Sequence, residues 1–215
     1  SAPLITEWSL VRVQEGPPFL VKKKVLNLKT INIIIIFLTV LITYKASAEM
    51  LILDKLDNPG KTTQGQIWSF FTDGVMGGLS QGKVKLDKIE NIECYRMLGN
   101  VTTANNGGFI QIRSYIKPTI KVSDYEGIYL KVYGNNKKYS LHIRTPLTVA
   151  PWQYYSYSFE SPNNWNKIKA PFSKFNKSNF YQPKNLKSQK IKTIGLVAGF
   201  DDFQADICLS EIGLY

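Results

Sequence analysis

The sequence has few of the residues on which most metal and catalytic sites depend. It contains one histidine and two cysteines in 215 residues. A four-cysteine zinc site, a histidine-cluster metal site and a disulfide-dense scaffold are therefore excluded. The single histidine also leaves little room for the side chain that most often acts as a general base. We expect no metal site, no cofactor and no catalytic residues.

Motifs for nucleotide binding and hydrolysis are also absent. The glycines within Gly74–Gly82 lack the G-x-G-x-x-G spacing, and neither a P-loop nor a G-x-S-x-G elbow occurs. A Ser–His–Asp arrangement would have to use His142, which alternates with apolar residues and is expected to face outward from a strand. We interpret Asp201-Asp202 as turn formers, with a calcium or ligand contact as the alternative.

Acidic residues are scarce relative to basic ones. There are 16 Asp and Glu against 27 Lys and Arg, which gives a net charge of +11. Most of the basic residues are lysines spread along the chain, with no arginine-rich patch and no basic helix stripe. Dispersed lysines of this kind are typical of solvated loops and strand faces. We therefore expect no nucleic-acid partner.

The apolar run at 31–44 is shorter than the roughly 20 residues that a spanning helix needs. Lys22–Lys24 precede it, and Ala46-Ser47-Ala48 follow it. This order is typical of a helical signal peptide, here 22–48, with cleavage before Glu49 and export to the bacterial cell envelope (periplasm). The alternative is an uncleaved membrane anchor through 31–44. We interpret residues 1–21 as a spurious or disordered N-terminal extension.

Residues 49–215 are predicted to form one all-β domain. Aromatic residues are frequent, with 12 Tyr, 11 Phe and 4 Trp, and such side chains favour half-buried pleated surfaces. About ten short β-prone runs recur between turn signals, as in a sandwich or jelly roll. The clearest are Gln66–Phe71, Lys83–Asp87, Glu93–Thr103, Gly108–Ser114, Ile128–Tyr133, Tyr139–Thr145, Tyr155–Phe159, Ile191–Phe200 and Asp206–Tyr215. Short helices are expected near Leu51–Asp57 or Phe172–Phe175.

Strand alternation predicts which side chains are buried. The expected core residues are Trp68, Phe109, Ile128, Leu130, Val132, Leu141, Ile143, Ile168, Leu196 and Ile212, with Gln111, Lys131 and His142 on the opposite faces. Cys94 and Cys208 both fall in predicted strands. Export would permit a disulfide between them, but we favour two buried free thiols because nothing in the sequence brings them together.

The stretch Trp68–Gly82 has an unusual composition. Its sequence is WSFFTDGVMGGLSQG, in which adjacent glycines indicate a positive φ or a close backbone approach. Asp73 and Ser80 are expected to cap turns. Either a glycine-dependent crossover or a binding loop explains the pattern. As candidate binding residues we take Asp73, Gly74, Met76, Gly77, Gly78 and Ser80, together with Arg113 and Arg144, because we expect at least one of these arginines to lie near the loop and to form an ion pair with Asp73.

The same stretch resembles the signature of the complex I intermediate-associated protein 30 (CIA30) family, which are assembly factors for NADH:ubiquinone oxidoreductase. Further matches follow in order at Asn106–Arg113, Tyr125–Arg144, Trp165–Phe175 and Ile194–Tyr215. The resemblance covers roughly 54–215. It implies a galactose-binding-domain-like jelly roll and a non-enzymatic, chaperone-like role in complex I assembly, with a protein partner among membrane-complex subunits.

Three functional hypotheses follow, each with its own structural expectation. A protein-binding assembly module, which we favour, predicts an exposed apolar or aromatic patch without a small-ligand pocket. An exported carbohydrate-binding module predicts exposed aromatic residues such as Trp152, Tyr154 or Tyr155 beside polar groups. An enzyme predicts that Asp73, Arg113, Arg144 or Asp201 converge in one cleft with shifted pKa values.

Overall fold

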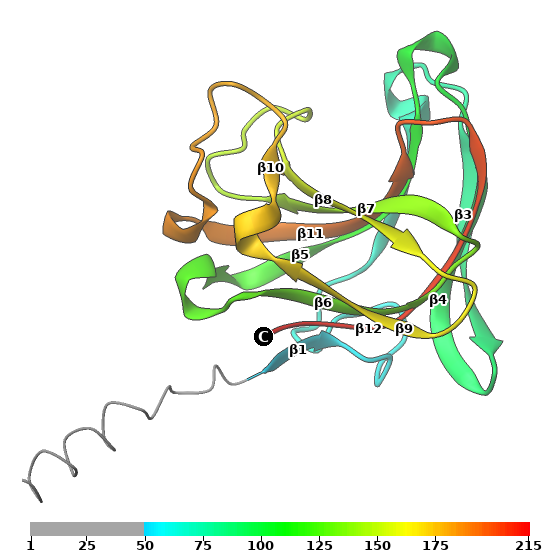
Figure 1. Ribbon diagram of the computed structural model, residues 1–215, viewed down its shortest axis with the longest axis horizontal. Coiled ribbons are helices and arrows are strands. Elements are labelled where there is room, and N and C mark those ends of the chain that lie inside the picture. Colours follow the sequence, from blue (N-terminus) through cyan, green and yellow to red (C-terminus); the bar gives the residue numbers. More distant parts are fainter. Residues whose placement is uncertain (1–49) are drawn as a thin grey trace, which may run out of the picture. The chain divides into compact units, whose positions relative to one another are not determined.

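The computed structural model describes residues 50–215. The segments with alternating apolar residues form two antiparallel β-sheets that face each other (Figure 1). The expected signal peptide at 22–48, the alternative anchor at 31–44 and the extension at 1–21 lie outside the described residues. Within residues 50–215, none of the helices has the length and apolar character needed to cross a membrane.

The first sheet has the order β3-β4-β12-β6-β9, and β1 pairs with β12 beside this path. Its strands are β1 (Leu51–Asp54), β3 (Gln81–Ile89), β4 (Ile92–Val101), β6 (Gly127–Tyr133), β9 (Asn166–Pro171) and β12 (Phe203–Leu214). Most neighbours in this order are not consecutive in sequence, so the chain crosses repeatedly between the sheets. Such crossovers, with all pairing antiparallel, make a jelly roll.

The second sheet has the order β10-β8-β7-β11-β5-β2. Its strands are β2 (Ser69–Thr72), β5 (Phe109–Lys121), β7 (Lys137–Arg144), β8 (Tyr155–Ser161), β10 (Asn176–Lys177) and β11 (Lys190–Gly199). Five short 3₁₀ helices connect strands among the described residues: η1 (Asp73–Met76), η2 (Ala104–Asn106), η3 (Val122–Asp124), η4 (Phe172–Lys174) and η5 (Leu186–Ser188). The short helix expected near Phe172 is thus present as η4.

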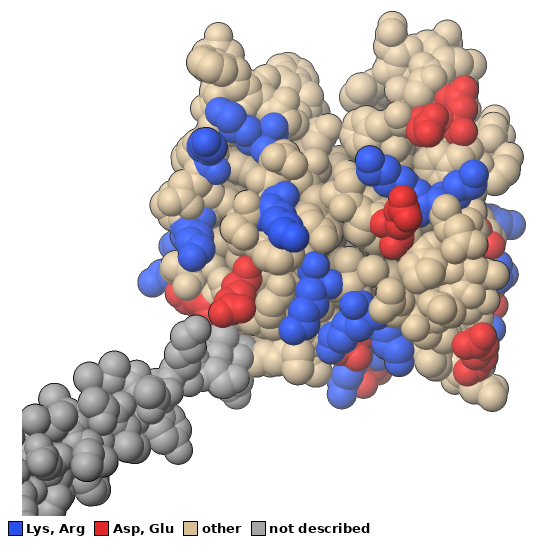
Figure 2. Space-filling model, viewed as in Figure 1, with Lys and Arg blue, Asp and Glu red and all other residues tan. Residues whose placement is uncertain are grey.

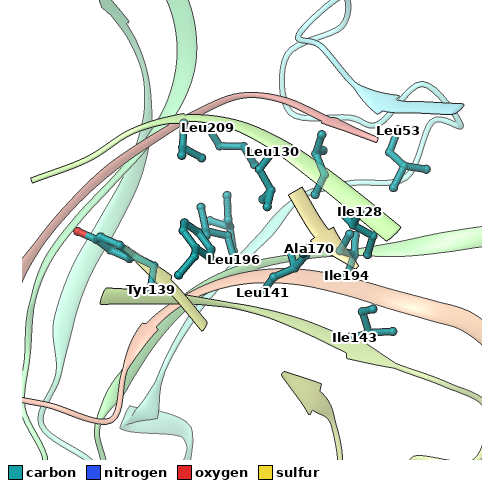
Figure 3. Close-up of a cluster of buried hydrophobic side chains, with 14 of the residues drawn as sticks. Leu53, Ile128, Leu130, Tyr139, Leu141, Ile143, Ala170, Ile194, Leu196 and Leu209 are labelled. Atoms are coloured by element: carbon teal, nitrogen blue, oxygen red, sulfur yellow. The ribbon is translucent and has the colours of Figure 1, made fainter. Parts of the chain in front are cut away.

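The core lies between the two sheets (Figure 3). Seven of the predicted core residues are at most 1% exposed: Ile128, Leu130, Val132, Leu141, Ile143, Leu196 and Ile212. Trp68 and Ile168 are partly buried against this cluster. The prediction for Phe109 is wrong, because Phe109 shares the outer face of β5 with Gln111 while Ile110 takes the inward position. Residues two apart on a strand face the same way.

The expected helix near Leu51–Asp57 is also wrong. Residues Leu51–Asp54 form β1, which pairs with the last strand of the chain. The buried Asp54 carboxylate accepts hydrogen bonds from Leu56 N, Trp68 Nε1 and Tyr95 Oη. Trp68, Tyr95 and the paired strand β12 are distant in the sequence and hold the segment extended, so no local pattern predicts this conformation.

The two cysteines form a disulfide, which corrects our expectation of free thiols. Cys94 lies on β4 and Cys208 on β12, and these strands are neighbours in the first sheet. Their Cα atoms are 5.4 Å apart, and both side chains are fully buried. The disulfide closes a loop of 114 residues in the sequence.

Candidate functional site

The outer face of the second sheet carries a hollow of about 490 Å³. It is lined by parts of β2, β5, β7 and β11 and by the loops around them: Phe71, Val75, Met76, Asn106, Gly107, Gly108, Phe109, Gln111, Arg113, His142, Arg144, Pro151, Trp152, Tyr154, Thr193, Gly195, Val197 and Phe200. In Figure 1 the loops around this sheet rise to either side of β7 and β8, and Figure 2 shows a notch between them.

Strand register explains the floor of the hollow. Gly195 of β11 pairs with Arg113 of β5 on one side and with His142 of β7 on the other. Because glycine has no side chain, the sheet surface is bare at Gly195, while the side chains of Arg113 and His142 project from the same face on either side of it. The inward residues of the same strands belong to the core. The alternation that builds the core therefore also assembles the floor.

Two arginines supply the charge of the hollow. The Arg113 guanidinium lies 4.6 Å from the centroid of the Phe71 ring, a cation–π contact that orients its plane. Arg144 donates from Nη2 to the carbonyls of Thr148 and Ala150 at 2.9 and 2.8 Å, whereas its buried Nε has no hydrogen-bond partner within residues 50–215. Burial, aided by the charge of Arg113, lowers the pKa of Arg144.

His142 faces outward from β7, as predicted, and is covered by aromatic rings. Its ring stacks on Tyr154 with centroids 4.0 Å apart and an interplanar angle of 11°, and Phe200 lies 5.9 Å away. Burial lowers the pKa of His142 to about 3. The imidazole is therefore neutral at physiological pH and too weakly basic to act as a general base there.

Exposed apolar side chains surround the opening. Trp152 is 65% and Phe200 60% exposed, and on η1 Val75 and Met76 are 72% and 64% exposed. Tyr154 lines the hollow but is only partly exposed, because it stacks on His142, whereas Trp152 fulfils the expectation of an exposed aromatic beside polar groups. Tyr155 does not, because it is buried in the core and its hydroxyl donates to Pro183 O.

Asp73 is the first residue of η1 and is fully buried. Its carboxylate accepts hydrogen bonds from Ser80 N at 2.9 Å, Ser80 Oγ at 2.5 Å, Gly108 N at 2.5 Å and Phe109 N at 3.2 Å. Burial by itself raises the pKa of Asp73, but these hydrogen bonds outweigh it and lower the pKa below the usual value. We call this arrangement of Asp73, Ser80, Gly108 and Phe109 the Asp73 knot.

Glycines make the knot possible. Gly77 ends η1 with φ of 87°, which confirms the predicted positive φ at the glycine pair. A Cβ on Gly78 or on Gly107 would overlap the Asp73 side chain. The glycine-rich segments 77–78 and 107–108 therefore enclose one carboxylate, although they are thirty residues apart in the sequence.

Comparisons with known proteins agree with this architecture. The family model "Complex I intermediate-associated protein 30 (CIA30)" matches residues 57–210.

The chain belongs to the CIA30 family.

A family 11 carbohydrate-binding module of a Clostridium thermocellum cellulosomal cellulase is structurally similar, with 16% identity, a TM-score of 0.58 and coverage of 77% of this chain and 93% of that one. The same type of module in complex with a β-1,3-1,4-mixed-linked tetrasaccharide gives 16% identity, a TM-score of 0.57 and coverage of 77% and 94%. At this identity the likeness establishes the shared jelly-roll fold. No curated protein sequence matches the chain.

Some residues of the CIA30 motifs line the hollow, and others form the Asp73 knot below it. Met76, Arg113 and Arg144 line the hollow, whereas Asp73 and Ser80 lie in the knot below it. Gly74, Gly77 and Gly78 shape the turn that carries Met76. The expected ion pair between Asp73 and an arginine is wrong, because the carboxylate is already occupied by backbone amides and Ser80. The sequence analysis missed Phe71, Phe200 and Val197, and only their outward phase on strands or turns could have indicated them.

Of the four residues that the enzyme hypothesis named, Arg113 and Arg144 line one hollow, but neither aspartate lines it with them. Asp73 is turned away into the knot, and Asp201 lines a separate hollow beside Asp202 and Phe203. Among residues 50–215 there is no group of three His, Cys, Asp or Glu side chains placed to hold a metal ion. Asp202 accepts hydrogen bonds from Thr103 N and Oγ1, which are distant in the sequence, so it links two loops and does more than form a local turn.

Proposed function

We propose that this CIA30-family chain is a non-catalytic saccharide-binding module whose binding site is the hollow on the second sheet. The observation that carries the proposal is the combination of exposed Trp152 with Tyr154 and Phe200 beside Gln111 and Arg113. Apolar sites with a few fixed polar groups bind small ligands, and flat aromatic rings suit the C–H faces of sugars. The mixed-linkage tetrasaccharide complex of the Clostridium thermocellum module supports the same class of ligand.

A protein-binding assembly module, with respiratory complex I as its target, is the second candidate. CIA30 family membership favours it, as does a row of exposed apolar residues on and after η1, namely Val75, Met76 and Leu79. Apolar residues gathered on one exposed loop are typical of a protein contact. In this hypothesis η1 itself, rather than the floor of the hollow, binds the partner.

Binding of the full chain to a panel of neutral and acidic polysaccharides by affinity electrophoresis and calorimetry tests the proposal. We expect Trp152→Ala to weaken binding at least ~10-fold, in line with the loss of one aromatic contact. Phe180→Ala is the matched control, because Phe180 is 84% exposed and does not line the hollow.

Failure of the unmodified chain to bind any member of the panel would contradict the proposal. Equal losses in the Trp152 and Phe180 variants would contradict it as well. Capture of membrane-complex subunits that is abolished by Met76→Ser would favour the second candidate.

We also propose that the domain acts in the bacterial cell envelope after export. The apolar run and the Ala-Ser-Ala site support export, and so does the buried Cys94–Cys208 disulfide. Disulfides persist in oxidising compartments and are rare in reducing ones.

A further inference from the structure

The lining of the hollow carries positive side chains and no negative ones. Two arginines line it and no aspartate or glutamate does. Its histidine is neutral at physiological pH, because burial lowers the pKa of His142 to about 3. The charge of the lining therefore comes from Arg113 and Arg144 alone.

Arg96, the third arginine within residues 50–215, differs from these two because carboxylates neutralise it. Arg96 contacts Asp206 through Nε and Nη2 at 2.8 and 2.7 Å and reaches Asp87 from Nη1 at 3.1 Å. Within residues 50–215, neither Arg113 nor Arg144 forms a salt bridge. A partly buried guanidinium without a carboxylate partner binds an anion favourably, because hydrogen bonds between two charged groups are stronger than those to neutral acceptors.

Both guanidinium groups are nevertheless held in place. Arg113 lies against the Phe71 ring, and three loop carbonyls, of Thr148, Val149 and Ala150, hold Nη2 of Arg144. The buried Nε of Arg144 remains without a partner. Planar donors that are fixed before binding favour carboxylate or sulfate groups, because little side-chain entropy is lost.

We propose that the ligand of this hollow is an anionic saccharide, whose carboxylate or sulfate is bound by Arg113 and Arg144 while its ring stacks on Trp152. This inference rests on the proposed function, since it names the class of sugar bound at the same site. Arg113 supplies the charge from the floor, and the aromatic rim supplies the apolar contact.

The test compares the full chain's affinity for three oligosaccharides of equal length: a hexuronate, a sulfated galactan and a neutral mixed-linkage β-glucan. We expect one anionic class to bind at least ~10-fold more tightly than the neutral sugar at low salt, with the advantage shrinking as ionic strength rises. Comparison of the affinities for the hexuronate and for the sulfated galactan shows whether a carboxylate or a sulfate is recognised.

Arg113→Gln should weaken binding of the anionic sugar at least ~10-fold and weaken binding of the neutral sugar much less, because Arg144 is then the only cation left in the lining. Arg113→Lys should restore part of the preference, since it keeps the charge but loses the planar donor fork. Lys88→Gln, an exposed position on β3 of the other sheet, removes the same charge outside the hollow and should have no effect.

Three outcomes overturn the inference in distinguishable ways. Equal affinity for neutral and anionic sugars, unchanged in Arg113→Gln, refutes the anionic ligand but leaves the saccharide-binding proposal intact. Failure to bind any of the three sugars refutes both. Arg113-dependent binding of an acidic peptide without sugar binding assigns the hollow to a protein partner. Thermal unfolding of each variant checks that the fold is retained.

Discussion

At the scale of single residues, Asp73 combines a charge with complete burial. Its cost of burial is offset by four hydrogen bonds, three of them from backbone N–H groups. Those N–H groups would lose this acceptor if the carboxylate were removed. The sequence analysis expected Asp73 to cap a turn, and a residue with only that role would tolerate replacement by alanine with a mild loss of stability. The burial of the knot reverses this expectation.

We predict that Asp73→Ala lowers the free energy of unfolding by about 3 kcal/mol or more, because each buried N–H left unpaired costs about 1–3 kcal/mol. Urea denaturation measures the loss. Asp201→Ala is the matched control, since Asp201 is exposed and accepts only from its neighbour's N–H, and it should change stability by less than about 0.5 kcal/mol. Equal effects of the two variants would contradict the structural role of the knot.

At the scale of elements, β5, β7 and β11 each serve two surfaces. Their inward residues, such as Leu141, Ile143 and Leu196, belong to the core. Their outward residues, such as Arg113, His142 and Gly195, form the floor of the hollow. A shift of register by one residue would exchange the two sets. The stability of the core therefore fixes the geometry of the hollow.

His142 should make the stability of the domain depend on pH. Its pKa is lowered to about 3 by burial, from an ordinary value of 6.5, so between these values the unfolded chain takes up a proton that the folded chain does not. The free energy of unfolding should therefore decrease as the pH falls below 6.5, by up to about 2 kcal/mol at pH 5. Above pH 7 the residue should contribute no pH dependence.

Chemical denaturation at pH 7.5 and pH 5.0 checks this prediction. His142→Phe preserves the stacking on Tyr154 and cannot be protonated, so its stability should fall less over the same interval. An identical loss in both proteins would show that other groups cause the acid sensitivity.

At the scale of the whole molecule, residues distant in sequence are brought together at a few points. The knot joins Asp73 to Gly108, β1 pairs with β12, and a disulfide connects β4 to β12. The backbone amide of Gly127 also donates to the last residue, Tyr215. The Asp73–Gly108 and Gly127–Tyr215 contacts join residues of the CIA30 motifs, which indicates that part of the motif pattern serves the architecture.

If the chain is exported as proposed, its N-terminus and its disulfide can be predicted. We expect protein isolated from the native cell envelope to begin at or near Glu49, and we expect Cys94 and Cys208 to resist alkylation unless a reductant is added. N-terminal sequencing and intact mass measurement check both points. A cytosolic expression of residues 49–215 provides the reduced control. Recovery of the envelope protein with residues 1–48 still attached would contradict cleavage.

Most strands could be predicted from the sequence because period-2 alternation is a local pattern. Leu141 and Ile143 show this alternation, and the turns at Asn105–Gly108 and Gly134–Asn136 are a second local signal, in their Asn and Gly content. Strand β1 could not be predicted, because its short segment is extended only through partners far away in the chain. The candidate site was predicted in part: Arg113 and Arg144 were named, but their neighbours across strands were not.

The sequence by itself determined the all-β class, the inward phase of most strands and the positive φ at the Gly77-Gly78 pair, since each depends on local sterics and side-chain periodicity. Only the tertiary structure decided that Asp73 binds backbone amides rather than arginine, that Cys94 and Cys208 are paired, and that the arginines share an aromatic hollow. These outcomes depend on strand order and register, which set which distant residues meet and which local patterns do not encode.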